Sequence, residues 1–121
     1  MSKITLYGLS PNKCDTMKKA LKWLEANGTD FEFHDYKKAG LSAKLADELL
    51  ANVDVSILIN VRGTTFRQLS DDDKAAIKDQ QDKATAKRIM LDNPSVIKRP
   101  VLEHNGKYLV GFKPEQYVAF V

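Results

Sequence analysis

The sequence predicts an α/β fold built on a four-stranded mixed sheet, with a helical insertion between the second and third strands. The first 35 residues read as strand, helix and strand, which is the βαβ unit of a parallel sheet. Two strand-like segments near the C-terminus flank Asn105-Gly106, which is a strong signal for a type I′ hairpin turn. The region between these two parts is mostly helical in its pattern of apolar residues.

The elements of the βαβ unit follow from local patterns. Alternating apolar residues predict a strand at Lys3–Tyr7, and Gly8–Lys13 supplies turn residues. A helix is expected from Asp15 to about Asn27, because apolar residues then recur at helical spacing. Phe31–Asp35 alternates again and is predicted to be the second, parallel strand.

The middle of the chain carries three helical segments and one ambiguous segment. Helices are predicted at Leu41–Asn52, with Ser42 as the N-cap, at Ser70–Lys78, with a capping-box-like start at Ser70, and at about Asp82–Leu91. The segment Val53–Val61 has an apolar residue at every second position, which by period alone indicates a strand. Between these elements, residues 62–65 are predicted to form a polar loop.

The C-terminal part completes the sheet. Strands are predicted at Val101–His104 and Lys107–Gly111, and a helix at Pro114–Val121 whose residues Tyr117, Val118 and Val121 are expected to pack inward. This order of elements is the thioredoxin-like layout. A fold of that kind places a cis proline before its third strand, so we expect the bond between Arg99 and Pro100 to be cis.

Size and composition exclude several classes of protein. The 121 residues are expected to form a single thioredoxin-like domain over 1–121, with the helical insertion at about 41–93. A net charge of +3 is too small to indicate nucleic-acid binding, and no apolar run is long enough to span a membrane. With one cysteine and two distant histidines, no metal site is expected. A chain with one cysteine and no apparent signal peptide is expected in the reducing cytoplasm.

The single cysteine, Cys14, immediately precedes the first predicted helix. Unpaired N–H groups and the helix dipole at that position favour the thiolate, which is the nucleophilic form. The neighbouring Lys13 adds positive charge, whereas Asp15 opposes a second anion. The alternative is that Cys14 is a small buried apolar residue, as many lone cysteines are.

A thiolate and an anionic substrate both need cations nearby. Arg62 and Arg99 are the arginines that we expect to supply them, because each lies in an otherwise apolar stretch of sequence. For Arg62 and also for Lys113, an ordinary solvated surface position is the alternative.

Five segments together resemble the ArsC/Spx family, and within it the small one-cysteine, YffB-type branch of arsenate reductase-like proteins. The segments are CDTMKKA at 14–20, FHDYKKAGL at 33–41, NVRGTTFRQL at 60–69, IKRPVL at 97–102 and VGFKPEQY at 110–117. The resemblance covers nearly the whole chain. It implies a bacterial protein with a thioredoxin-like fold, and it implies a helix rather than a strand at Val53–Val61.

The resemblance also assigns roles to individual residues. Cys14 corresponds to the nucleophilic cysteine of arsenate reductases, and Arg62 to an arginine that contacts the oxyanion. Arg99 corresponds to the arginine that precedes the cis proline, here Pro100, and faces the cysteine. Lys113 stands where the family has a third arginine, and a lysine keeps the charge but loses the bidentate fork.

Two other departures affect the expected chemistry. Six residues separate Tyr7 from Cys14 where the family usually has four, and Met17 stands where Spx-type regulators have the second cysteine of their C-x-x-C switch. No disulfide can therefore form within these 121 residues, and an external thiol must release any covalent intermediate.

The function expected from the residues and the resemblance is that of a thiol-dependent reductase. Cys14 would act as nucleophile through a mixed disulfide, with no bound cofactor, with glutathione as co-substrate and with glutaredoxin as a further candidate partner. The two carboxylates of glutathione suit Arg62, Arg99 and Lys113. The alternatives are a true arsenate reductase coupled to glutathione and glutaredoxin, a regulatory protein that binds RNA polymerase as Spx does, and a family member that has lost its chemistry.

Overall fold

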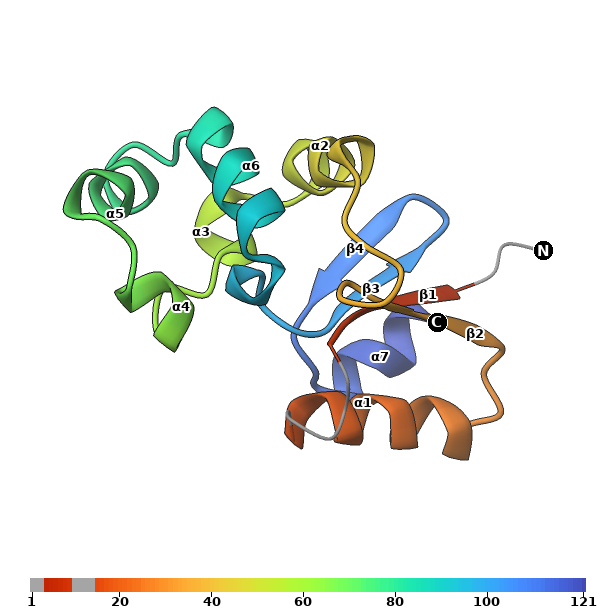
Figure 1. Ribbon diagram of the computed structural model, residues 1–121. Coiled ribbons are helices and arrows are strands. Elements are labelled where there is room, and N and C mark those ends of the chain that lie inside the picture. The colour runs from red at the N-terminus through yellow and green to blue at the C-terminus, as the bar shows by residue number, and fades with distance from the viewer. Residues whose placement is uncertain (1–3, 10–14) are drawn as a thin grey trace. The chain divides into compact units, whose positions relative to one another are not determined.

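The computed structural model describes residues 4–9 and 15–121 of the chain (Figure 1). These residues divide into two compact units. The first contains the chain up to Gly40 together with Arg99–Val121, and the second contains Leu41–Lys98. Each unit is described by itself below.

The first unit is built on a four-stranded mixed sheet. Its strands are β1 (Ile4–Gly8), β2 (Phe31–Asp35), β3 (Val101–His104) and β4 (Lys107–Val110), in the spatial order β2-β1-β3-β4. β1 is parallel to β2 and antiparallel to β3, and β3 is antiparallel to β4. The predicted mixed sheet is therefore confirmed.

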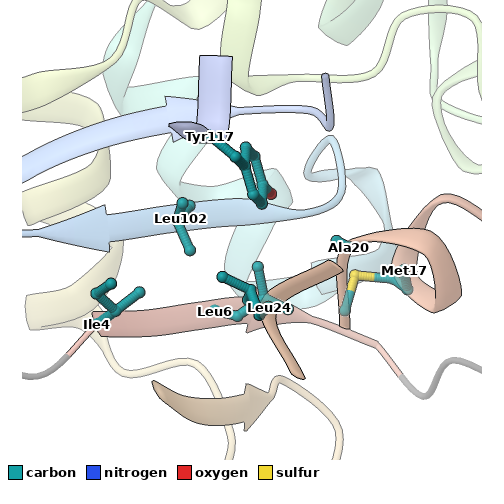
Figure 2. Close-up of a cluster of buried hydrophobic side chains, with 7 residues drawn as sticks. All are labelled: Ile4, Leu6, Met17, Ala20, Leu24, Leu102 and Tyr117. Carbon is teal, nitrogen blue, oxygen red and sulfur yellow. The ribbon is translucent and has the colours of Figure 1, made fainter. Parts of the chain in front are cut away.

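Two helices, α1 (Asp15–Ala26) and α7 (Pro114–Phe120), contribute to the main core of this unit. Figure 2 shows the buried side chains that the strands and helices share. They are Ile4, Leu6, Met17, Ala20, Leu24, Leu102 and Tyr117, of which all but Ile4 are fully buried. The core residues of α1 recur at intervals of three and four, so one apolar stripe attaches the helix to the sheet.

The short helix α7 corrects one expectation from the sequence. Tyr117 is fully buried as predicted, but Val118 is 66% exposed and Val121 is 39% exposed. Successive residues of a helix lie about 100° apart around its axis, so a helix that directs Tyr117 inward turns Val118 away.

The turns of the first unit follow their sequence signals closely. Asn105 and Gly106 both have positive φ angles, +54° and +78°, as a type I′ turn requires. The peptide bond between Arg99 and Pro100 is cis, as expected.

The second unit consists of short helices that pack on one another. They are α2 (Ala43–Asn52), α3 (Val55–Leu58), α4 (Thr64–Arg67), α5 (Asp71–Lys78), α6 (Lys83–Asp92) and the 3₁₀-helix η2 (Pro94–Val96). Ser42 caps α2, because its hydroxyl oxygen accepts from the Leu45 N–H at 3.1 Å, and Ser70 caps α5 in the same way through the Asp73 N–H. Both caps were expected from the sequence.

The ambiguous segment 53–61 contains one short helix of four residues. The strand indicated by its period is wrong for Val55–Leu58, which form α3, while Ile59 makes a single antiparallel bridge to Ile97. The predicted polar loop at 62–65 is also partly wrong, since Thr64 begins α4, whose Phe66 is buried. Among the residues described, no helix has the length and apolar character needed to cross a membrane.

Candidate functional site

One end of the sheet gathers several of the residues that the sequence singled out. The parallel strands β1 and β2 end there, β3 begins there and β4 ends there. Hydrogen bonds extend the pairing beyond the strands, because the Tyr36 N–H donates to the Gly8 oxygen at 2.9 Å and the Gly111 N–H donates to the Pro100 oxygen at 2.8 Å. In α/β sheets, ligands bind outside the carboxyl ends of parallel strands.

The helix α1 begins at this same end, because a helix that connects two parallel strands runs back along the sheet. Its first residue, Asp15, is exposed. Cys14 and Lys13, the predicted nucleophile and its neighbouring cation, lie outside the described residues. Their predicted roles therefore remain predictions.

Arg99 and Lys113 both lie near this end of the sheet. Arg99 is half-buried and immediately precedes Pro100, which is buried. Lys113 is exposed at the N-cap of α7, where its carbonyl oxygen accepts from the Gln116 N–H at 2.9 Å. The Tyr117 hydroxyl donates to the Gly111 oxygen at 3.2 Å, and this bond ties α7 to the segment that pairs with Pro100.

Three aromatic rings, which sequence reasoning did not select, lie at the carboxyl end of β1 and β2. The Tyr7 and Tyr36 rings are nearly parallel, with centroids 6.3 Å apart, and the His34 ring lies 5.1 Å from Tyr7 and 5.9 Å from Tyr36. The His34 Nε2 is 2.8 Å from the Gly40 oxygen, so the ring donates this hydrogen bond from Nε2. The alternation in β2 could have placed His34 on the same face as Tyr7, but it could not have indicated the stacking.

Tyr36 is the most unusual member of this group. Its side chain is buried, and its hydroxyl has no hydrogen-bond partner within the described part of the chain. Burial raises the pKa of Tyr36 well above its usual range; the Tyr7 hydroxyl adds to this effect and the Arg99 guanidinium opposes it. The Tyr36 hydroxyl is therefore neutral, and the positive charge of Arg99 is close enough to affect its pKa.

Arg62 belongs to the second unit, where it lines a pocket of about 380 Å³. Lys98 lines the same pocket, because its main-chain N–H donates to the Leu58 oxygen at 2.8 Å and so holds the segment before Arg99 against α3. Both cationic residues are exposed. Lys98 was not selected from the sequence, although it lies next to Arg99 in the motif IKRPVL and could have been included on that ground.

Residues 4–9 and 15–121 contain no group of three or more histidine, cysteine, aspartate or glutamate residues that could hold a metal ion. The described features are instead two regions with cationic side chains. One contains Arg99 and Lys113 in the first unit, and the other contains Arg62 and Lys98 in the second unit. Chemically, both suit anionic groups such as carboxylates and oxyanions.

The parallel β1–α1–β2 unit, the β3–β4 hairpin, the final helix and the cis proline before β3 define the thioredoxin-like class of folds. Between β2 and β3 this chain carries a stretch of short helices. The chain belongs to the ArsC family, whose sequence profile matches residues 9–120.

Comparisons with individual proteins agree with this assignment. An arsenate reductase (ArsC)-related protein from Brucella melitensis is 50% identical, with a TM-score of 0.76 over 98% of this chain and 93% of the other. A protein named YFFB is 43% identical, with a TM-score of 0.85 over 97% of both chains. The global transcriptional regulator Spx of Streptococcus pyogenes is 28% identical over 98% of this chain and 84% of its own length.

Proposed function

We propose that the protein is a glutathione-dependent thiol reductase of the arsenate reductase-like type, with Cys14 as its nucleophile. The observation that supports this most strongly is the convergence at one end of the sheet. There α1 begins directly after the only cysteine of the chain, and Arg99 precedes a buried cis proline at the same end. The similarity to an arsenate reductase-related protein at 50% identity adds to this support.

The proposed reaction proceeds by thiol–disulfide exchange. The Cys14 thiolate attacks the glutathione sulfur of a mixed disulfide RS–SG, which forms a bond between Cys14 and glutathione and releases RS⁻. A second glutathione thiolate then attacks the glutathione sulfur bound to Cys14, which releases oxidised glutathione and restores the Cys14 thiolate. In sum, one RS–SG and one glutathione yield one RSH and one oxidised glutathione.

Positively charged side chains near the end of the sheet would stabilise the thiolate of Cys14 and the carboxylates of glutathione. Arg99 carries charge at the end of the sheet where α1 begins, and a neighbouring cation keeps a thiolate ionised near neutral pH. Lys113 lies near the same end and supplies a second positive charge. A reducing compartment such as the cytoplasm would provide the glutathione.

Mass spectrometry tests the covalent step. Protein isolated without added reductant, or treated with oxidised glutathione, is expected to gain about 305 Da on Cys14. The variant Cys14→Ser is the matched control, since this chain has one cysteine and the variant should gain nothing. A wild-type protein that stays unmodified at all concentrations of oxidised glutathione would overturn the proposal.

The pH dependence of alkylation tests whether the thiol is activated. We expect the rate of reaction with iodoacetamide to rise with a midpoint below the free-thiol value of about 8.5. A midpoint at or above that value contradicts an activated thiol. Turnover is then measured with a glutathione mixed disulfide and, in parallel, with arsenate in the presence of glutathione and glutaredoxin.

The similarity to Spx supports a second candidate, a regulatory protein that binds RNA polymerase without turnover. The missing second cysteine argues against a disulfide switch of the C-x-x-C type, because Met17 occupies that position. A pull-down from bacterial lysate with wild type and Cys14→Ser separates the two candidates. Stoichiometric polymerase in both samples, with no thiol turnover, would favour the regulatory function.

A further inference from the structure

The helix α1 of the first unit has two different sides. Its apolar stripe is part of the buried cluster, so that side is fixed against the sheet (Figure 2). Because successive helical residues lie about 100° apart, Lys18, Lys19 and Lys22 fall on the side away from this stripe, and all three are exposed. Together with Asp15 they form the basic face of α1, which lines a hollow of about 230 Å³.

The lysines of the basic face are not neutralised within the described part of the chain. The ion pairs found in that part both belong to the second unit, and neither uses a residue of α1. Lys18 and Lys22 lie four positions apart, and like charges at that spacing weaken a helix. Asp15 offers one carboxylate against three ammonium groups, so the basic face is positive as a whole and favours an acidic partner.

The composition of the basic face favours a protein as that partner. Nucleic acids and acidic membranes present negative charge along their whole surface, and the carboxylate of Asp15 would repel either of them. A polypeptide can combine carboxylates for the lysines with a basic side chain for Asp15. The methylene stems of the lysines also offer apolar contact beside the charges. The basic face therefore matches a protein segment rich in aspartate and glutamate.

The choice of lysine favours a brief encounter over a tight complex. Lysine is depleted from the centres of stable interfaces, and exposed charges mainly accelerate association. A substrate that leaves after each turnover requires this kind of contact. In the sequence, Cys14 directly precedes Asp15, so the basic face belongs to the helix that follows the proposed nucleophile.

Building on the proposed glutathione-dependent reaction, we propose that the basic face of α1 selects the substrate, an acidic protein segment that carries a glutathionylated cysteine. In the proposed exchange, RS–SG is then a protein mixed disulfide, and RS⁻ is the protein thiolate that leaves. The basic face contributes to the encounter and not to the bond changes. Acidic segments therefore react faster at low ionic strength, and salt removes their advantage.

Peptide substrates of different charge test this selection. Three peptides carry one cysteine as its glutathione mixed disulfide and differ only in the flanking residues, which are glutamate, glutamine or lysine. The rate of glutathione transfer to Cys14 is divided by the rate of the same peptide with dithiothreitol, which corrects for the leaving group. This corrected rate should be about tenfold higher for the glutamate peptide than for the glutamine peptide at low salt. The two rates should be equal at about 1 M salt, where the Debye length is about 3 Å.

Single lysine variants locate the selection on the basic face. Lys18→Gln and Lys22→Gln should each reduce the preference for the glutamate peptide by about twofold. Lys107→Gln is the matched control, since it removes the same charge from an exposed lysine of the first unit at the start of β4. The proposal is overturned if wild type does not prefer the glutamate peptide, or if Lys18→Gln and Lys22→Gln both behave as the control does.

A binding measurement tests the basic face without any thiol chemistry. The glutamate peptide, with serine in place of its cysteine, is titrated into ¹⁵N-labelled Cys14→Ser protein, and the largest NMR shift changes should fall at residues 18–22. A dT oligonucleotide and phosphatidylserine vesicles, each at the same total negative charge, should not displace the peptide. Absence of these shift changes, or displacement by either polyanion, overturns the proposal. A Cys14 that no mixed disulfide modifies, together with these shift changes, would instead refute the proposed function and support the binding face.

Discussion

The main-chain N–H of Lys98 donates to the carbonyl oxygen of Leu58 at 2.8 Å, across 40 residues of sequence. This bond and its neighbour from Asn60 to Val96 make a minimal two-stranded pairing inside a helical unit. The pairing connects α3 to the segment that leads to Arg99. The pairing therefore positions the main chain at Lys98 and beside Arg62, which are two exposed cationic residues of the second unit.

Replacement of Ile97 by alanine is expected to weaken this pairing. Ile97 is fully buried, so its truncation removes apolar contacts and leaves a cavity, at a cost of about 2–5 kcal/mol in the free energy of unfolding. Urea unfolding followed by circular dichroism measures the loss. Truncation of the exposed Ile57 is the control and should cost less than about 1 kcal/mol; equal losses would show that the bridge has no special role.

The two buried tyrosines of the first unit are expected to respond in opposite ways to loss of their hydroxyl groups. Tyr117→Phe removes a bond to the Gly111 oxygen and should destabilise the protein by about 1 kcal/mol. Tyr36→Phe removes a buried hydroxyl without a partner among the described residues, so stability should stay unchanged or rise. Denaturant titrations of both variants measure the change in the free energy of unfolding. If Tyr36→Phe loses as much stability as Tyr117→Phe, the Tyr36 hydroxyl has a hydrogen-bond partner.

Gly8 and Met17 are expected to be energetically coupled. A Cβ atom at Gly8 would lie 2.5 Å from the Met17 sulfur, and Met17 is fully buried. Gly8→Ala should therefore cost about 1–3 kcal/mol through overpacking, and Met17→Ala about 2–5 kcal/mol through a cavity. The double variant should lose clearly less than the sum, because the new methyl group fills part of that cavity. Strictly additive losses in thermal unfolding would refute the contact.

The Asp82 carboxylate should make a small contribution to the dependence of stability on pH. The Thr85 hydroxyl donates to it at 2.5 Å, and this bond is the main reason why the pKa of Asp82 lies below its ordinary value of 3.8. A carboxyl whose pKa is lower in the folded state stabilises the protein above its unfolded pKa, and this stabilisation disappears as the pH falls through the folded value. An NMR titration of Thr85→Val should show the Asp82 pKa raised, whereas an unchanged value would remove the proposed cause.

Local signals in the sequence predicted the structure correctly where a residue type is favoured for one specific physical reason, as at helix caps and tight turns. Ser42 and Ser70 were identified as caps because a hydroxyl before a helix satisfies an otherwise unpaired N–H. Asn105-Gly106 was identified as a turn because its backbone requires positive φ at both positions. The sheet followed from these local elements together with the rule that a βαβ unit makes parallel strands.

The segment 53–61 shows where such signals fail. Its alternating apolar residues indicated a strand, yet Val55, Leu58 and Ile59 are buried at helical spacing while Ile57 is exposed. The apolar Leu58 breaks the alternation, and the packing of α3 against its neighbours in the second unit decides the outcome. The resemblance to a family, rather than the period, predicted a helix in this segment, and the structure has one over Val55–Leu58.

For the candidate site, the sequence predicted individual residues but not which residues lie together in the structure. Arg62 was selected without Lys98, because their association depends on a pairing between residues 58–60 and 96–98. Tyr36 was not selected at all, since nothing local distinguishes a buried tyrosine with a bonded hydroxyl from one without. Long-range pairing of this kind carries no local signature in a single sequence.

The bonds from Gly111 to Pro100 and from Tyr117 to Gly111 have a practical consequence for work with recombinant protein. Trimming that reaches Tyr117 removes its bond to the Gly111 oxygen, and with it the support for the residue that pairs with Pro100. Crystallisation and labelling schemes should leave α7 whole and append any fusion partner through a spacer. A shortened version that loses thiol reactivity would then report on that missing support rather than on Cys14 itself.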